Sequence, residues 1–293
     1  MKVLVTGATG FLGKTILAGL PQSFIKYTLG RNSGSDIVCN LAAEIPVLDA
    51  VETVVHAAAK AHTVPSNDKD AAEFWSVNYD GTCNLLRALE RAPRLPKCFV
   101  FISTVAVYGL DTGENIDETA PLNGFTPYAK SKIAAEREVT EWCSRHQVNF
   151  VILRLPLVVG ENAPGNLGKI RSAIQKGRYV RIKSNPARKS VVSAEDVARI
   201  IPALIDKQGI FNLTDGCHPL FSQIEDAISR ETGRPVRFSL PVGLLKFVAK
   251  VGDYIPMFPL DTVRLQKMTS TLTFSDAKAR VELGWNPQPA FHY

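Results

Sequence analysis

Short apolar runs alternate with longer amphipathic patterns through the first two-thirds of the chain. The runs have the length of buried strands, and their β-branched residues favour extended backbone. Between them, apolar residues recur at helical spacing, most clearly over Phe74–Glu90 and Pro127–Arg145. The alternation predicts an α/β fold with a doubly wound parallel sheet. The predicted strands are Lys2–Thr6, Ile25–Leu29, Ile37–Cys39, Thr53–His56, Cys98–Ile102, Phe150–Leu153 and Ile210–Leu213.

The pattern changes after Leu155. The stretch "PLVVGENAPGNLGKI" is rich in Gly, Pro and Asn, which predicts a long connection before a helix near Ile170–Gly177. From about His218 the chain is mainly helical, with proline breaks. We therefore expect a sheet domain over residues 1–155, with a returning strand near 209–214. Residues 156–208 and 215–293 are expected to form a smaller, mainly helical lobe.

Three glycines, Gly7, Gly10 and Gly13, follow the first predicted strand in "TGATGFLG". Glycine costs backbone entropy, so a regular set indicates a geometric requirement. These three lie where a strand turns into a helix, and the N–H groups and dipole of a helix N-terminus can receive a phosphate. The spacing is typical of a Rossmann-type dinucleotide site, while the glycines alone also fit a tight turn without a ligand.

Composition and charge narrow the class of protein. No apolar run in the 293 residues approaches the ~20 needed to span a bilayer, so we expect no membrane insertion. The N-terminus does not have the pattern of a signal peptide. Five scattered cysteines without a CxxC pair indicate a cytoplasmic protein without a metal site. The formal charge of +6 fits an ordinary solvated basic surface and also suits an anionic small molecule, and no basic, aromatic-interleaved stretch favours nucleic acid.

Two polar stretches carry candidate chemistry. In "PYAKSK", Tyr128 and Lys132 are four residues apart and share one helix face. A nearby ammonium lowers the pKa of a phenol, which would suit Tyr128 for hydroxyl–carbonyl interconversion. In "CFVFISTVAVYG", Ser103 and Thr104 end a strand at the sheet edge where ligands bind. Thr104 could hold a substrate oxygen against Tyr128, and a purely structural capping role is the alternative.

Together these stretches resemble the extended short-chain dehydrogenase/reductase family, in its nucleotide-sugar epimerase/dehydratase group. The resemblance covers nearly the whole chain, through "TGATGFLG", "HAAA", "VNYDGTCNLL", "STVAVYG", "PYAKSK", "LRLPLVVG" and "RVELGWNP". It implies that Thr104, Tyr128 and Lys132 form the catalytic set. It also implies a dinucleotide bound within the sheet domain by Gly7, Thr9, Gly10, Phe11, Leu12, Gly13, Asn40, Leu41, Ala57, Ala58, Ala59, Lys60, Ser103, Tyr128, Lys132 and Leu155.

The residues after the second predicted strand bear on which dinucleotide binds. A carboxylate there would favour NAD by accepting hydrogen bonds from the adenosine ribose. Gly30 and Arg31 occupy this place, and Arg31 can pair with a 2′-phosphate. The sequence therefore predicts NADP(H), with NAD(H) as the alternative, and Asp36 would weaken the prediction if the strand ended later. Asn40, beside Leu41, replaces the family's usual acidic residue and still suits an adenine amide contact.

The residues after the catalytic threonine bear on the reaction. Dehydratases of the family carry an Asp-Glu pair there, and this chain has Val105 and Ala106, which transfer no proton. Two reactions remain: a 4-ketoreductase with exchangeable NADPH, and a UDP-sugar 4-epimerase with retained NAD. Arg31 favours reduction, and the C-terminal sequence resembles the bacterial polysaccharide branch, which suggests a UDP-4-keto-6-deoxyhexosamine. A non-catalytic NADP(H) sensor and a reductase of apolar ketones are further alternatives.

Substrate recognition is expected from the smaller lobe together with Thr104 and Val105. Asn166 in "PGN" and Arg188 in "ARKS" are the candidates for nucleotide diphosphate contacts, since arginine binds phosphate through a bidentate fork. Arg178, Arg181 and Lys183 compete for the same role. Relatives often dimerise through the two long predicted helices, so the resemblance leaves a homodimer open.

Overall fold

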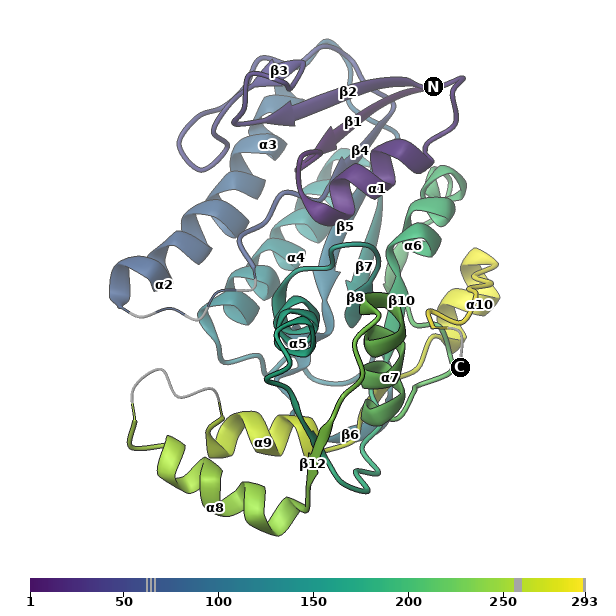
Figure 1. Ribbon diagram of the computed structural model, residues 1–293. Helices are drawn as coiled ribbons and strands as arrows, with labels where there is room; N and C mark the ends of the chain where they lie inside the picture. Colours follow the sequence, from purple (N-terminus) through teal and green to yellow (C-terminus); the bar gives the residue numbers. More distant parts are fainter. Residues whose placement is uncertain (62, 64, 66, 256–259, 292–293) are drawn as a thin grey trace.

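A seven-stranded parallel sheet forms the centre of the computed structural model, which describes residues 1–61, 63, 65, 67–255 and 260–291. The strand order is β11–β7–β5–β4–β1–β2–β3 (Figure 1). Every predicted strand is present, with ends displaced by at most two residues. The strands are β1 (Lys2–Thr6), β2 (Ile25–Gly30), β3 (Ile37–Val38), β4 (Thr53–His56), β5 (Cys98–Thr104), β7 (Asn149–Leu155) and β11 (Gly209–Asn212).

Helices cover both faces of this sheet. Along β1, Val3 and Val5 pack in one apolar cluster with α1 (Phe11–Gly19) and α6 (Ala194–Ile200). Leu4 points the other way, into a second cluster with α3 (Gly81–Glu90) and α4 (Pro127–His146). Successive strand residues therefore bury opposite faces, as a doubly wound sheet requires. The predicted fold class is confirmed.

The helix predicted over Phe74–Glu90 is divided into three parts. α2 (Asp68–Trp75) leads into a π-helical turn, η1 (Ser76–Asp80), and then into α3. The turn buries Asn78, whose amide accepts from Lys60 N at 2.7 Å and donates to Ser131 Oγ at 3.0 Å. A single α-helix was therefore the wrong prediction, because one polar side chain is fixed inside by bonds to distant segments.

The chain after β7 contains more strand than the sequence indicated. The predicted long connection holds β8 (Leu157–Val159), which pairs with β10 (Val191–Ser193). α5 (Gly165–Gln175) begins five residues earlier than expected. β9 (Val180–Ile182) pairs with β12 (Phe238–Leu240), and β6 (Gly113–Ile116) pairs with β13 (Leu272–Phe274). The other elements are η2 (Val105–Tyr108), η3 (Ile201–Leu204), α7 (Phe221–Thr232), α8 (Val242–Gly252), α9 (Thr262–Thr269) and α10 (Ala277–Leu283).

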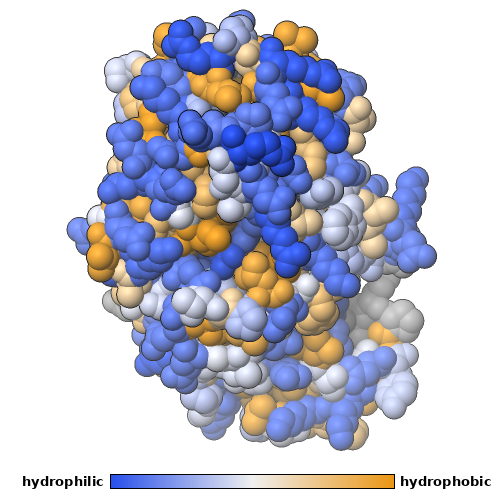
Figure 2. All heavy atoms as spheres, turned by 180° about the vertical axis from the view of Figure 1, so that it is seen from behind, coloured by the Kyte–Doolittle hydropathy of each residue, from blue (hydrophilic) through white to orange (hydrophobic). Residues whose placement is uncertain are grey.

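We call β9, β12, α5, α7, α8 and α9 the small lobe. It lies beyond the carboxyl ends of the sheet strands, with α8 at the end of the molecule farthest from β3 (Figure 1). Leu245 and Ala249 of α8 pack with Leu265 of α9 in its core. The back of the molecule is mainly hydrophilic, with hydrophobic residues in separate groups (Figure 2). No helix in the described ranges has both the length and the apolarity to span a membrane.

Gly13 should be a sensitive position in this fold. An added Cβ would lie 2.1 Å from the carbonyl oxygen of Gly7, a backbone atom that cannot move without opening the β1–α1 turn. Gly13→Ala should lower the free energy of unfolding by about 2 kcal/mol or more, measured by urea denaturation. Gly243→Ala is the matched control, because a Cβ there meets nothing within 4 Å. Equal stability of the two variants would contradict the packing of this turn.

Candidate active site

The β1–α1 turn has the geometry of an anion site. Gly7 has a positive φ of +69°, and a Cβ on it would lie 2.6 Å from Ala58 N. Gly10 is the N-cap of α1 and offers no side-chain acceptor. The N–H groups of the first turn, from Phe11 onward, therefore have no cap and point outward from the sheet edge. Such a helix start fits a dinucleotide pyrophosphate.

The predicted contact residues after β4 are held by a buried histidine. His56 Nδ1 and Thr6 Oγ1 are hydrogen bonded at 2.6 Å, and His56 Nε2 and Thr82 Oγ1 at 2.9 Å. Thr6 Oγ1 also accepts from Ala58 N at 3.2 Å. Burial, reinforced by the charge of Lys132, lowers the pKa of His56 to about 3, so the ring is neutral at pH 7. These bonds hold the start of the segment that contains Ala57, Ala58, Ala59 and Lys60 in place against β1.

The loop after β2 presents an arginine without a competing carboxylate. Arg31 is exposed directly beyond the strand. The carboxylate of Asp36 accepts from Thr28 N at 2.8 Å and from Thr28 Oγ1 at 2.7 Å. These bonds lower the pKa of Asp36 and tie it to the strand. Residues 31–35 contain no acid, so Arg31 supplies the charge at this position.

The remaining predicted cofactor residues lie at strand ends or in the first turn of α1. Asn40 is exposed, and its carbonyl accepts from Ala43 N at 2.9 Å. Leu41 is buried in the core, and its carbonyl accepts from Asn84 Nδ2 at 2.8 Å. The others fall on the same edge of the sheet: Thr9, Phe11 and Leu12 at the β1–α1 turn, and Leu155 as the last residue of β7.

Tyr128 and Thr104 meet where β5 ends and α4 begins. Thr126 caps α4 by accepting from Ala129 N at 3.1 Å, and Pro127 follows at the first helical position. This start places Tyr128 in the first turn of α4, where the Thr104 hydroxyl interacts with its phenol and opposes the rise in its pKa. The Thr104 hydroxyl also accepts from Ala106 N at 3.2 Å. The same threonine therefore caps a turn and contacts the phenol.

The phenol of Tyr128 is protonated at neutral pH. Burial raises its pKa to about 12, against the opposing hydrogen bond with Thr104. The expected lowering by Lys132 is wrong for this structure, because the ammonium is directed to β5. Lys132 Nζ donates to Ile102 O at 2.7 Å and lies 3.8 Å from the centroid of the Phe101 ring. In this arrangement Tyr128 can donate a proton but does not readily accept one.

Behind Lys132 lies a buried polar network that sequence reasoning missed. Burial lowers the pKa of Lys132 to about 7, and the charge of Glu136 opposes the change. Arg154 Nη2 is 2.7 Å from Glu136 Oε2, and Ser103 Oγ donates to the same carboxylate. Ser103 is thus engaged with Glu136 rather than free at the sheet edge. Arg154 within an otherwise apolar strand could have indicated this network in the sequence, since a buried charge needs a partner.

The residues after Thr104 limit the chemistry of the site. Val105 and Ala106 lie in η2, partly buried, and carry no group that could transfer a proton. Among the described residues, no three or more His, Cys, Asp or Glu side chains gather where they could hold a metal ion. Of the three predicted catalytic residues, Tyr128 and Lys132 are the ones with a group that readily transfers a proton.

The predicted substrate residues lie on separate elements. Asn166 is exposed in the first turn of α5. Arg188 is exposed, and its Nη1 donates to His218 O at 3.0 Å. Arg181 is engaged elsewhere, with Nε 2.7 Å from Glu225 Oε2 and a second ion pair to Asp226, so it is a poor candidate. Arg178 and Lys183 are exposed.

Comparisons with known proteins agree with this architecture. The model of the NAD dependent epimerase/dehydratase family matches residues 3–213. The Escherichia coli N-acetyl-alpha-D-glucosaminyl-diphospho-ditrans,octacis-undecaprenol 4-epimerase is 25% identical over 94% of this chain and 88% of its own. The Vibrio cholerae UDP-glucose 4-epimerase is 24% identical over 97% of this chain and 90% of its own.

Solved structures match the fold over nearly its full length. A Thermotoga maritima UDP-glucose 4-epimerase with UDP-glucose has a TM-score of 0.75 and 19% identity, covering 98% of this chain and 94% of its own. A Thermus thermophilus UDP-glucose 4-epimerase with NAD has a TM-score of 0.73 and 22% identity, and the match covers 98% of this chain and 94% of its own. RMD from Pseudomonas aeruginosa with NADPH has a TM-score of 0.70 and 19% identity, and the match covers 98% of this chain and 94% of its own. Neighbours of this fold thus bind either dinucleotide.

The buried His56 should make stability depend on pH. Its folded pKa of about 3 lies below the ordinary 6.5, so below pH 6.5 the unfolded chain binds a proton that the folded protein excludes. Stability should therefore fall as the pH drops from 6.5, by about 3 kcal/mol at pH 4 from this group. His56→Gln should flatten that slope in urea unfolding between pH 7 and 4. His146→Gln, at a more exposed histidine, should not, and equal slopes would refute the assignment.

Proposed function

Since this chain belongs to the NAD dependent epimerase/dehydratase family and is an NAD(P)-dependent enzyme, we propose that it reduces a nucleotide-linked ketosugar with NADPH. The proposed substrate is a UDP-4-keto-6-deoxyhexosamine, reduced at C4. The observation that carries the proposal is the position of the Tyr128 phenol at the start of α4, where it interacts with the Thr104 hydroxyl at the end of β5. A reduction needs a proton donor at this place, and the neighbouring Val105 and Ala106 make dehydration unsuitable.

The reaction divides into a hydride and a proton. NADPH, when bound, would supply the hydride that reduces the carbonyl carbon. Tyr128 gives its phenolic proton to the carbonyl oxygen, which Thr104 holds by a hydrogen bond, and Tyr128 recovers a proton from water. Lys132, whose ammonium binds Ile102 O, is proposed to bind the nicotinamide ribose. The ketone becomes an alcohol as the cofactor is oxidised.

Two charged positions support the choice of cofactor and substrate. Arg31, exposed after β2 with Asp36 tied to Thr28, is proposed to pair with the 2′-phosphate of NADPH. Arg188, exposed beside His218, is proposed to bind the substrate diphosphate through its guanidinium, with Asn166 as a further contact. Both assignments use cations that remain accessible in the structure.

A UDP-sugar 4-epimerase with retained NAD is the second candidate. It is favoured by the two similar relatives, which are named as 4-epimerases and are aligned over most of their length. An epimerase must first remove a proton from a sugar hydroxyl, and a phenol with a pKa of about 12 is a weak acceptor at neutral pH. Reduction therefore ranks first. A non-catalytic sensor ranks last, because Thr104, Tyr128 and Lys132 are all retained.

Tyr128→Phe should separate chemistry from binding. Removing the hydroxyl deletes the proton donor and leaves the ring, so turnover of a UDP-linked 4-ketosugar should fall by ~10²-fold or more. NADPH binding, measured by fluorescence quenching, should remain close to that of the parent protein. Turnover within a few-fold of the parent would mean that another group donates the proton. Turnover of an apolar ketone instead of the ketosugar would overturn the substrate class.

Arg31→Ala should change cofactor choice. Losing a cation that pairs with the 2′-phosphate should weaken NADPH binding by about tenfold or more and leave NADH nearly unaffected. Calorimetry on the cofactor-stripped protein measures the dissociation constants of NADPH and NADH. Lys14→Ala, an exposed cation on α1, is the control for a general loss of charge. If the parent retains NAD tightly and prefers it to NADP, the epimerase moves into first place.

A further inference from the structure

The outer face of α8 carries an apolar stripe. Leu244, Phe247, Val248 and Val251 follow the spacing i, i+3, i+4, i+7, which puts them on one side of the helix. Phe247 is 67% exposed, Leu244 48% and Val251 43%. The opposite side, with Leu245 and Ala249, already packs in the core of the small lobe. The stripe therefore lies largely outside the core of the small lobe and suits an external partner.

Exposed hydrophobic side chains extend the stripe at both ends of the helix. Tyr254 and Ile255 follow it and are 88% and 47% exposed. Phe238, in β12 just before the helix, is 58% exposed. α8 is at the far end of the molecule (Figure 1), so a flat surface could approach it without meeting the sheet domain.

The charge around the stripe is positive. Between residues 234 and 267 the chain has six basic and two acidic side chains. Lys246 and Lys250 are exposed on α8, which contains no acid. Paired copies of this face would bring lysines toward lysines, because a twofold interface repeats the same surface. The charge instead complements an anionic surface.

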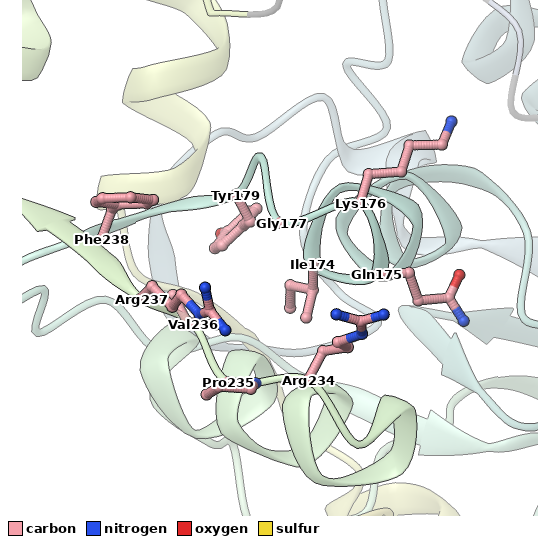
Figure 3. A pocket seen from close by; sticks show the side chains of 10 residues that line it. All are labelled: Ile174, Gln175, Lys176, Gly177, Tyr179, Arg234, Pro235, Val236, Arg237 and Phe238. Carbon is pink, nitrogen blue, oxygen red and sulfur yellow. The ribbon is translucent and has the colours of Figure 1, made fainter.

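A basic pocket on the small lobe is lined in part by Phe238. It has a volume of about 410 Å³ and lies between the C-terminal end of α5 and the connection from α7 to β12 (Figure 3). Both Arg234 and Arg237 line it, with the Arg237 guanidinium on the side of Tyr179 and the Arg234 guanidinium near Ile174 and Gln175. Neither arginine has an ion pair or side-chain hydrogen bond to the described residues. Phe238 belongs to both the pocket wall and the apolar surface.

We propose that α8, Phe238 and this pocket form a surface that docks on anionic phospholipid membranes. The apolar stripe would enter the headgroup boundary, as the apolar faces of interfacial helices do. Lys246 and Lys250 would extend their ammonium groups toward the lipid phosphates, and Arg234 and Arg237 would bind phosphate through planar forks. The helix lies on the membrane and does not cross it. The inference is independent of the reaction proposed above.

Vesicle binding tests the proposal with the full-length protein. It should sediment with phosphatidylcholine vesicles that contain phosphatidylglycerol, and far less with phosphatidylcholine alone. Rising salt should weaken the binding. Phe247→Asp should lower the affinity by about tenfold or more, since it replaces the centre of the apolar stripe with an acid. Val281→Asp on α10, 85% exposed, is the matched control and should bind like the parent.

A second variant guards against misfolding. Arg234→Gln combined with Arg237→Gln changes only exposed side chains and should also weaken binding to the anionic vesicles. Circular dichroism and light scattering on every variant check the fold and the oligomeric state. Absence of sedimentation by the parent, or unchanged binding by both variants, would overturn the proposal. So would a dimer of the parent that Phe247→Asp splits, because the stripe would then be a contact between copies.

Discussion

The ion pair between Glu136 and Arg154 is the constraint on which the candidate site depends. Both side chains are almost fully removed from water, with Arg154 Nη2 2.7 Å from Glu136 Oε2. Burying either charge alone would cost several kcal/mol, so the two must be brought together wherever the chain folds. Glu136 is on α4 and Arg154 on β7, with β5 between them in the network through Ser103. The pair thereby sets how deeply α4 lies on the sheet.

The position of α4 on the sheet determines which groups of β5 the side chains in its first two turns contact. Arg154 continues the network through Tyr108 to Asn212 of β11, with bonds of 3.1 and 2.7 Å. Lys132 lies one turn from Glu136, and its ammonium donates to Ile102 O near the end of β5. Tyr128 lies one turn further, against Thr104. A buried network thus orients Lys132 and Tyr128, the two residues of the proposed proton chemistry.

Short-range patterns revealed most of the fold and much of the site. The strands of the sheet, the helix starting at Pro127 and the glycine turn each follow from neighbours in sequence. The pKa of Tyr128 could not be predicted in this way, because the direction of the Lys132 ammonium depends on β5, some thirty residues away. The π-helical turn at Asn78 could not be predicted from neighbouring residues either, because Asn78 bonds to the distant Lys60 and Ser131. The outer stripe of α8 has the same periodicity as a core-facing one, so its exposure required the packed structure.

The position of β11 has a consequence for synthesis of the protein. This edge strand pairs with β7 but follows it by more than fifty residues, all of which leave the sheet and return. Until residue 212 has left the ribosome, β7 presents an open edge of unpaired backbone groups, and Tyr108 lacks the Asn212 amide. The β7 edge is therefore exposed to wrong pairing while residues 156–212 are made. Closure of the sheet is a long-range event that has to wait for this whole segment.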